Sequence, residues 1–359
     1  MSATATATST ATAPTTTTSG AVPRTMLAAQ LVEDSAPLAL TEIPVPTPGK
    51  DEVLVKMESC GVCHTDVHFW KGEDSLPRER PAVLGHEGVG TVVARGEGAD
   101  AVADGARVGV GFVFDACGTC RECRRGFETY CANSRATGVH VEGCFAEYVV
   151  APADWVTAIP ENLTSDEACP LLCAGVTAYS AVRKAQIEPG SVVVIFGLGG
   201  LGQYAIQIAK LFGATVVGID LDPGKLETAR TLGADHAFQP GEEAVAAVQE
   251  LGGADACLSF APSPAVFRSM FDFAAPMARF IQVALPDKPF SFTAAEVIDL
   301  GITVIGSADG TRLERDQLMQ LAAQGKVRSN ISTLPFREIN DAFTALDEGR
   351  AEGRLVVTY

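Results

Sequence analysis

The sequence lacks any apolar run that approaches the length of about 18 residues needed for a membrane-spanning helix. It is also short of basic residues, because 27 Lys and Arg face 44 Asp and Glu and leave a formal net charge of −17. Such a charge repels nucleic acid and the anionic face of a membrane. We therefore expect neither a nucleic acid nor a membrane as a partner.

No basic-then-apolar leader precedes the ten cysteines, and the first charged residue is Arg24. Residues 1–23 form an Ala/Thr-rich stretch without the arginines of a transit peptide or the leucines of a signal core. We interpret residues 1–23 as a disordered tail with no catalytic role. Cysteines without a leader are more typical of free thiols and metal ligands than of disulfides. We therefore expect a cytoplasmic protein.

The length of 359 residues and the hydrophobic share of 47% are enough for two domains with full cores. Between about residues 25 and 160, short β-type runs are separated by Gly and Pro, as at 53–57, 90–94 and 145–152. This pattern predicts a mainly β body. From about Cys173 the pattern changes to strands alternating with helices, which is typical of an α/β fold with a doubly wound parallel sheet.

The second region can be followed strand by strand. Candidate strands occupy 191–197, 215–220, 234–238, 254–260, 279–285 and 302–308. Candidate helices lie at 200–213, 222–233 and 242–253, and another at 314–325 precedes a final β run at 354–359. Six strands with helical crossovers complete a dinucleotide-binding sheet. The final β run could return to pack on the first domain.

A glycine-rich turn follows the first of these strands and leads into a helical pattern. Its residues are Gly197, Leu198, Gly199, Gly200, Leu201 and Gly202. Gly197 permits the tight turn, Gly199 lets a pyrophosphate approach the backbone, and Gly202 lets helix and strand pack closely. The N-terminus of the helix then offers free N–H groups and a positive dipole to the phosphates.

The second strand ends at Asp220, whose carboxylate can accept hydrogen bonds from the ribose hydroxyls. A 2'-phosphate at that place would meet like charge, so we expect NAD rather than NADP as the cofactor. The alternative is a glycine turn with an incidental surface aspartate. Lys225 could add a contact to the adenosine ribose, or it could be an ordinary exposed helix lysine.

Four cysteines spaced Cx2Cx2Cx7C predict a second kind of site, and they are Cys117, Cys120, Cys123 and Cys131. Four thiolates can close a tetrahedral zinc site without an open position, so this metal would be structural. An iron–sulfur site usually carries a different fourth spacing. A zinc-stapled DNA-binding lobe is the other alternative, but three arginines there (Arg121, Arg124 and Arg125) on an acidic chain fit a solvated face better.

Three further segments hold ligand-type residues, namely CGVCHTDVH at 60–68, GHEGVG at 85–90 and LLCAG at 171–175. Spacing alone does not unite them. Together with the four cysteines and GLGGLG, they resemble the zinc-containing alcohol dehydrogenases of the medium-chain dehydrogenase/reductase superfamily, in order and separation. The resemblance runs from about Pro23 to Tyr359, and its wording is most similar to the yeast and bacterial tetrameric branch.

This resemblance implies a domain arrangement and a set of roles. The domains would be a GroES-like catalytic domain over 24–173 and 310–359, with the zinc lobe at 117–131, and a Rossmann domain over 174–309. The catalytic zinc would be bound by Cys63, His86 and Cys173, which makes two Zn²⁺ per chain. The other matched residues are Glu87 beside the metal, Asp66 behind the histidine ligand, Thr65 and His68 in a proton relay, and His64 and Arg354 at the pyrophosphate.

The chemistry agrees with these residue types. Zinc is a Lewis acid that lowers the pKa of a bound alcohol, and a hydroxyl and an imidazole can lead the proton out of a dry pocket. The substrate pocket is less defined, with Thr65, Trp70, Phe112 and Leu285 as candidates. Large apolar side chains there favour small primary alcohols, although both aromatic residues could equally be core residues. The remaining cysteines and histidines fit ordinary core positions, and they are Cys60, Cys144, Cys169, Cys257, His140 and His236.

We therefore expect NAD-dependent interconversion of an alcohol and its aldehyde or ketone. The alternatives are an aryl-alcohol, formaldehyde or secondary-alcohol dehydrogenase of the same superfamily, and a non-catalytic NAD(H)-binding sensor. A sensor would be expected to have lost a ligand or the relay, whereas this chain keeps every candidate. The family also implies a homodimer or homotetramer, for which the strand at 302–308 is a possible pairing edge.

Overall fold

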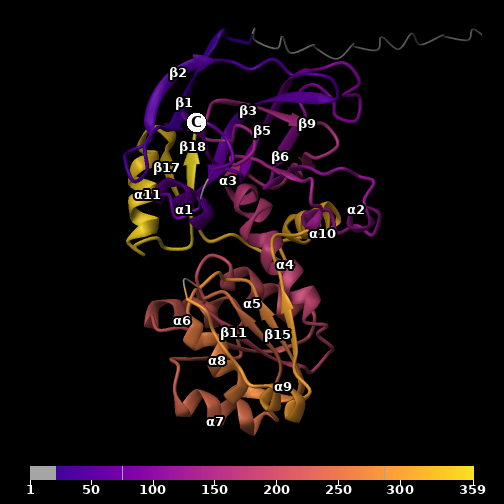
Figure 1. Ribbon diagram of the computed structural model, residues 1–359, viewed down its shortest axis with the longest axis vertical. Helices are drawn as coiled ribbons and strands as arrows, with labels where there is room; N and C mark the ends of the chain where they lie inside the picture. Colours follow the sequence, from indigo (N-terminus) through magenta and orange to yellow (C-terminus); the bar gives the residue numbers. More distant parts are fainter. Residues whose placement is uncertain (1–21, 75, 287) are drawn as a thin grey trace, which may run out of the picture.

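The computed structural model describes residues 22–359 other than residues 75 and 287. The chain forms a mainly β lobe and an α/β lobe, and helix α4 (Ala174–Lys184) runs between them (Figure 1). The predicted tail, residues 1–23, lies outside the described residues except for its last two. Within the described part of the chain, no helix has the length and apolar character needed to cross a bilayer.

The β lobe contains strands from both ends of the chain. They are β1 (Thr25–Leu31), β2 (Ala39–Pro44), β3 (Glu52–Gly61), β4 (Ala82–Val83), β5 (Gly88–Arg95), β6 (Arg107–Val110), β7 (Val113–Asp115), β8 (Arg135–Ala136), β9 (Tyr148–Pro152), β10 (Thr157–Ala158), β17 (Ile331–Pro335) and β18 (Arg354–Thr358). The main sheet has the order β10-β6-β5-β3-β18-β17, and β9 also pairs with β3. A second sheet has the order β2-β1-β4, and β7 pairs with β8.

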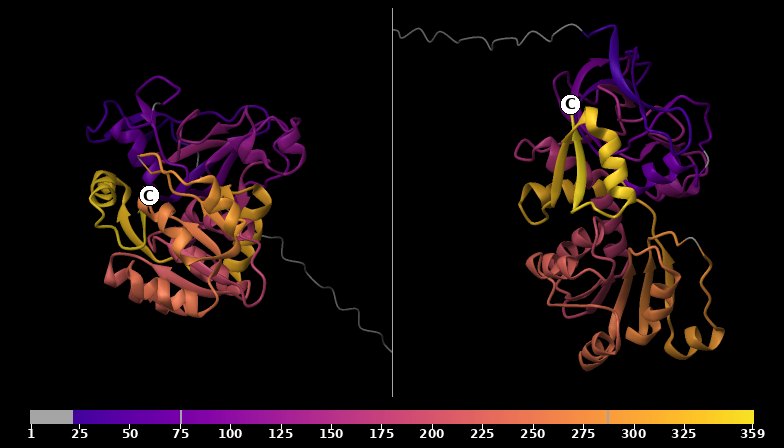
Figure 2. Two further views of the ribbon diagram at one scale, coloured as in Figure 1. Left: turned by 60° about the horizontal axis from the view of Figure 1, so that its bottom comes forward. Right: turned by 90° about the vertical axis from the view of Figure 1, so that its left-hand side faces the viewer.

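The predicted mainly β body is confirmed. The run at 53–57 lies within β3 and the run at 90–94 within β5, while only the second part of 145–152 forms β9. The final β run forms β18 and pairs antiparallel with β3, with Val357 opposite Cys60. The C-terminal segment, drawn in yellow, therefore packs on the first lobe (Figure 2).

The α/β lobe is the predicted doubly wound sheet. Its strands are β11 (Val192–Phe196), β12 (Thr215–Ile219), β13 (His236–Phe238), β14 (Ala254–Ser259), β15 (Ala274–Gln282) and β16 (Thr303–Gly306), and its helices are α5 (Gly202–Leu211), α6 (Pro223–Thr231), α7 (Glu242–Glu250), α8 (Pro264–Phe273) and α9 (Ala294–Leu300). All strands pair in parallel, in the order β13-β12-β11-β14-β15-β16. The order reverses at β11, and such a reversal creates the crevice at the carboxyl ends of the strands where dinucleotides bind.

Further helices complete the β lobe. They are α1 (His64–Lys71), α2 (Arg121–Arg124), α3 (Ser165–Ala168), α10 (Arg312–Ala323) and α11 (Ile339–Asp347), with short 3-10 helices η1 (Glu128–Tyr130), η2 (Cys169–Leu172) and η3 (Phe336–Glu338). Helix α10 begins two residues before the predicted start at 314. The reason is a capping box, in which the Thr311 side chain accepts a hydrogen bond from the Glu314 N–H and the Glu314 carboxylate accepts one from the Thr311 N–H.

One apolar core continues from the β lobe into the α/β lobe. It contains Val89 and Ile159 of the first lobe together with Ile195 and Leu258 of the second. Residues 174–182 of α4 lie inside this core, and every one of them is buried. The two lobes are therefore packed against a common helix rather than joined only by chain connections.

Burial in this core predicts a large difference between two leucines. Leu258 is 0% exposed on β14, whereas Leu313 is 62% exposed on α10. Leu258→Ala should lower the free energy of unfolding by about 2–5 kcal/mol, because it removes buried methyl groups and leaves a cavity. Leu313→Ala should change it by no more than about 0.5 kcal/mol. Urea denaturation followed by circular dichroism measures both, and equal losses would contradict the assigned core.

Candidate active site

The predicted ligands of the catalytic metal meet in one cluster. One ligand atom from each of Cys63, His86, Glu87 and Cys173 lies within 4.8 Å of the others. The Sγ atoms of Cys63 and Cys173 are 3.9 Å apart. Two sulfurs bound at about 2.3 Å to a tetrahedral zinc ion would be about 3.8 Å apart. The donor set therefore fits a zinc ion.

The main sheet explains why these distant residues meet. In the β3–β5 pair, Cys60 lies opposite Gly88. Cys63 follows the end of β3 and His86 precedes the start of β5, so the antiparallel pairing places them side by side. Cys173 lies between η2 and α4, and η2 packs against both β3 and β5.

Asp66 orients the histidine of the cluster. Its Oδ1 lies 3.2 Å from Nδ1 of His86 and accepts a hydrogen bond from the Gly85 N–H, while its Oδ2 accepts one from the Cys63 N–H. A proton on Nδ1 of His86 leaves the lone pair on Nε2 free. Nε2 is buried and has no hydrogen-bond partner among the described residues. A buried ring nitrogen of this kind, with a carboxylate behind it, is the usual arrangement of a zinc-binding histidine.

The two thiols of the cluster are hydrogen-bonded to each other. Hydrogen bonding from Cys173 and the nearby His86 ring hold the pKa of Cys63 well below its ordinary value, although burial opposes this shift. The Cys63 thiolate in turn raises the pKa of Cys173. A divalent cation would favour both thiolates, since metal binding releases the protons of its ligands.

A buried ion pair connects this cluster to the α/β lobe. Nη2 of Arg354 donates a hydrogen bond to Oε1 of Glu87, and both residues are almost completely buried. Burial raises the pKa of Glu87 to about 7, while Arg354 favours its ionised form. On its other side Arg354 lies against the glycine-rich turn, because a Cβ added at Gly200 would be 2.6 Å from Cδ of Arg354. The resemblance places Glu87 beside the metal and Arg354 at the pyrophosphate, and the structure joins these two residues.

The four predicted ligands of the structural metal also come together. The sulfur atoms of Cys117, Cys120, Cys123 and Cys131 all lie within 4.8 Å of one another. Cys117 Sγ is 3.6 Å from Cys131 Sγ and 4.0 Å from Cys123 Sγ. These separations fit a single tetrahedral ion. They are too short for a cluster of several iron and sulfur atoms, so the iron–sulfur alternative is disfavoured.

The glycine-rich turn has the geometry that its sequence predicts. Gly197 has a φ of +85°, and a Cβ added at Gly202 would be 2.0 Å from the carbonyl oxygen of Gly197. A Cβ added at Gly199 would meet nothing within 4 Å. Gly197 thus permits the turn, and Gly202 permits the close packing of α5 on β11. Gly199 faces open space that can admit a pyrophosphate.

Asp220 lies directly after β12 and contacts the same turn. Its Oδ2 accepts a hydrogen bond from the Leu198 N–H at 2.8 Å, and its Oδ1 accepts one from the Asp222 N–H at 3.0 Å. Lys225 lies half-buried in the first turns of α6. The carboxylate is therefore held at the carboxyl edge of the sheet, next to the turn, where a ribose would lie.

The predicted proton relay lies on α1. Thr65 is half-buried, His64 is exposed, and His68 follows Thr65 by three residues on the helix. His68 Nδ1 is 2.6 Å from Oε2 of Glu73, and the His68 side chain is 43% exposed. His68 is thus accessible to solvent, as a terminal proton donor or acceptor must be.

Of the predicted pocket residues, the structure brings Phe112 to the metal cluster. Its ring meets the His86 ring edge to face, with centroids 5.1 Å apart. Trp70 instead packs on Phe343 and donates its Nε1–H to the Ala36 carbonyl, which are contacts of a core residue. Leu285 is 81% exposed on the α/β lobe.

Sequence reasoning missed two charged residues near the metal cluster. Asp309 follows β16, and Arg315 is 4% exposed on α10. A Cβ added at Gly111, the neighbour of Phe112, would be 2.1 Å from Nη1 of Arg315. No motif contains either residue, and a charged residue at the start of a helix normally indicates a solvated face. The burial of Arg315 and the half-buried position of Asp309 were therefore not visible in the sequence.

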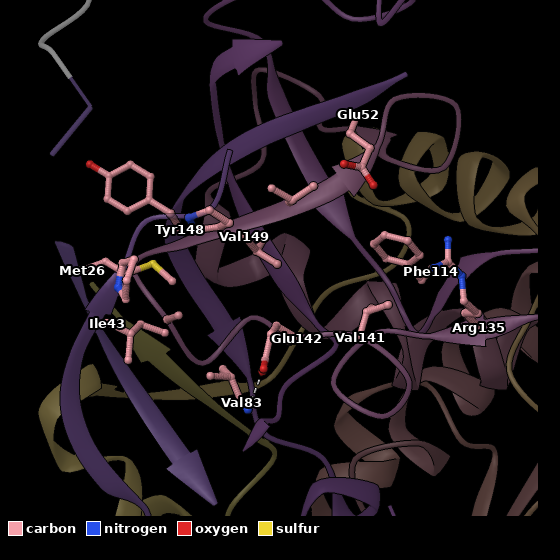
Figure 3. A pocket seen from close by; sticks show the side chains of 15 residues that line it. Met26, Ile43, Glu52, Val83, Phe114, Arg135, Val141, Glu142, Tyr148 and Val149 are labelled. Atoms are coloured by element: carbon pink, nitrogen blue, oxygen red, sulfur yellow. Dashed lines mark hydrogen bonds between the residues drawn. The ribbon is translucent and has the colours of Figure 1, made fainter. Parts of the chain in front are cut away.

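A cavity of about 300 Å³ lies elsewhere in the β lobe (Figure 3). Its lining is mostly apolar and includes Met26, Phe114 and Tyr148. The Glu142 side chain at this cavity accepts a hydrogen bond from the Val83 N–H. None of the residues that line it is a predicted ligand of either metal, so this cavity is separate from the candidate active site.

Comparisons with known proteins agree with this geometry. The family model described as the alcohol dehydrogenase GroES-like domain matches residues 49–161, and the one described as zinc-binding dehydrogenase matches residues 200–324. An alcohol dehydrogenase of Moraxella sp. (strain TAE123) is 40% identical over 336 residues, which cover 93% of this chain and 99% of that protein. The chain therefore belongs to the alcohol dehydrogenases of the medium-chain dehydrogenase/reductase superfamily and is an oxidoreductase.

Solved structures support the fold over almost the whole chain. The alcohol dehydrogenase of the archaeon Aeropyrum pernix is 34% identical, with a TM-score of 0.84. The match covers 93% of this chain and 100% of that chain. Acetophenone reductase from Geotrichum candidum, solved in complex with NAD, is 30% identical, with a TM-score of 0.85 and coverages of 95% and 99%. The predicted combination of a GroES-like domain and a Rossmann domain is confirmed.

The glycine-rich turn yields a paired prediction. Gly199→Ala should leave stability unchanged, because its Cβ has open space, but should weaken NADH binding by at least about tenfold, which is about 1.4 kcal/mol. Gly202→Ala should instead lower the free energy of unfolding, since its Cβ would collide with the Gly197 carbonyl. Thermal unfolding and fluorescence titration with NADH separate the two effects. Unchanged NADH affinity in Gly199→Ala would show that the pyrophosphate does not approach this residue.

Proposed function

We propose that this protein interconverts a small alcohol and its aldehyde or ketone with NAD, at a zinc ion bound by Cys63, His86 and Cys173. The observation that carries the proposal is the convergence, in one buried cluster, of two sulfurs and an imidazole nitrogen that has no hydrogen-bond partner within the described residues. Three protein ligands leave the fourth position of a tetrahedral ion for a substrate oxygen.

The chain's own residues prepare this site for the reaction. When bound, zinc supplies a Lewis acid for the substrate oxygen, and NAD supplies the hydride acceptor. Two thiolates neutralise the charge of the divalent ion, and Asp66 keeps the proton of His86 on Nδ1. The Thr65 hydroxyl would take the substrate proton while giving up its own, and His68, at the exposed end of the relay, would release a proton to solvent. Phe112 forms an apolar wall beside His86 and limits access of water.

A second zinc ion bound by the four cysteines of residues 117–131 is proposed to be structural. With all four positions occupied by sulfur, it has no place for a substrate. The proposed content is therefore two zinc ions per chain. The cytoplasm is the proposed location, because both thiol clusters require reduced sulfur.

A second substrate class is also compatible with this family. The similarity to an acetophenone reductase favours aryl ketones and secondary alcohols as a second candidate, and an aromatic side chain beside His86 could pack on an aryl substrate. Rates of NADH formation, measured by absorbance with primary, secondary and aromatic alcohols, separate the two candidates. A non-catalytic NAD(H) sensor would show no turnover with any of these alcohols, and membership of an oxidoreductase family disfavours it.

A homodimer or homotetramer is proposed through the edge of the six-stranded sheet. Strand β16 is the last strand of that sheet, and Val304 on it is exposed. Met277 and Ile298, in the neighbouring β15 and α9, are exposed as well. An exposed edge strand with apolar neighbours is suited to pairing with a second copy across a two-fold axis.

The metal assignment predicts the behaviour of Cys63→Ser. Turnover of alcohols, followed by NADH absorbance, should be abolished, and zinc content measured by plasma mass spectrometry should fall from about two ions to about one. NADH should still bind, because the glycine-rich turn is unchanged. Cys60→Ala, which removes a buried thiol three residues away, is the control and should keep both ions. Unchanged turnover in Cys63→Ser would refute the ligand assignment.

The ribose assignment predicts a change of cofactor preference in Asp220→Gly. Without the carboxylate, kcat/KM with NADP should rise relative to kcat/KM with NAD by about tenfold or more, because like-charge repulsion of the 2'-phosphate is removed. Asp220→Asn keeps a side chain that can accept the Leu198 N–H bond, so it tests the charge alone. If neither variant alters the ratio, Asp220 does not face the ribose.

A further inference from the structure

Asp309 occupies a position that the proposed function leaves without a role. It lies in the linker (residues 307–311) that leads from the carboxyl end of β16 to α10. In a doubly wound sheet the dinucleotide lies across the carboxyl ends of the strands. The first half of this sheet carries Asp220 for the adenosine ribose, so the nicotinamide belongs to the second half, β14–β16. Asp309 is therefore on the nicotinamide side.

The linker is held firmly by the lobe of residues 117–131. Glu128 Oε1 accepts hydrogen bonds from the backbone N–H and the Nε of Arg312, at 3.2 and 3.1 Å. Thr129 Oγ1 donates to the Gly310 carbonyl at 3.1 Å, and Lys184 Nζ donates to both Tyr130 and Ser307. These contacts fix the backbone on both sides of Asp309.

The conformation and surroundings of Asp309 are unusual for an aspartate. Its φ is +46°, and strained backbone of this kind is found preferentially at functional sites. Its Oδ1 is buried and accepts no hydrogen bond from any described residue. The Nε of Arg315 is also buried and has no hydrogen-bond partner in the part of the chain that the structure describes. A carboxylate with an unused buried oxygen is costly unless a charge or a ligand compensates it.

Asp309 is within electrostatic reach of the metal cluster. Burial raises its pKa to about 6, while Arg315, the backbone N–H of Gly310 and, more weakly, His86 favour the ionised form. In the other direction, Asp309 contributes to the raised pKa of Cys173. A hydride acceptor must lie beside the cluster, since the substrate oxygen would be bound there. Asp309 thus lies on the nicotinamide side of the sheet and is electrostatically coupled to the cluster at which the substrate oxygen would be bound.

We propose that the Asp309 carboxylate acts on the nicotinamide end of the coenzyme and favours its oxidised form over its reduced form. The nicotinamide ring carries a positive charge in NAD⁺ and none in NADH. A fixed negative charge in a partly buried site stabilises the cation and leaves the neutral ring almost unaffected. The inference rests on the proposed NAD-dependent function, and it concerns binding equilibria rather than turnover.

The test compares the dissociation constants of NAD⁺ and NADH, each measured by isothermal titration calorimetry on the full-length, zinc-loaded protein. In Asp309→Asn the affinity for NAD⁺ should fall by about tenfold relative to that for NADH, which is the effect of one unit charge about 12 Å away at an effective dielectric constant of about 20. Asparagine keeps the size of the side chain and tolerates a positive φ, so the variant should fold. Asp309→Glu keeps the charge and should keep most of the preference.

Asp316→Asn is the matched control, because it removes the same charge from an exposed position on α10. It should leave the ratio of the two dissociation constants unchanged. An unchanged ratio in Asp309→Asn, or an equal loss of both affinities, would overturn the proposal and leave Asp309 with at most a structural role. If the wild-type protein bound neither nucleotide, the proposed function itself would fail, and this inference with it.

Discussion

The burial of charge around Cys63, His86 and Cys173 is the constraint on which the rest of the structure depends. Two hydrogen-bonded thiols, the Glu87–Arg354 pair and an imidazole whose Nε2 has no partner among the described residues lie together with little access to water. Taking such groups out of water costs several kcal/mol per ion unless they are compensated. A divalent cation compensates the thiolates and the imidazole together, which is why this arrangement fits a metal site better than a structural hydrogen-bond network.

The buried Arg354 also connects the metal cluster with the α/β lobe. It is the first residue of β18, so its position depends on the return of the C-terminal strand to β3. From there it reaches Glu87 on one side and the turn at Gly200 on the other. A single buried guanidinium therefore ties the metal cluster of one lobe to the dinucleotide turn of the other, and it joins parts of the chain that no local sequence pattern connects.

The sequence predicted the α/β sheet well because its central strands are short and largely buried, as β11 is throughout, and because the glycine-rich turn has strict steric requirements. Helix α4 was not among the predicted helices, and the burial of residues 174–182 in the core shared by the two lobes follows from tertiary packing that no local pattern records. Trp70 and Leu285 illustrate another limit. Their predicted pocket role followed from position in the chain, whereas contact with the metal cluster depends on tertiary packing. Asp309 and Arg315 belong to no motif at all.

Helix α4 connects the metal cluster with the linker and holds the two at a fixed separation. It begins directly after Cys173, and its last residue, Lys184, donates hydrogen bonds to Ser307 and Tyr130. Between these ends Val176 touches the linker, since a Cβ added at Gly310 would be 2.4 Å from Cγ2 of Val176. A rigid helix that lies in the shared core therefore carries a metal ligand at one end and holds the linker at the other. A helix packed in this way resists bending, so it fixes the separation between Cys173 and the two points at which Val176 and Lys184 contact the linker.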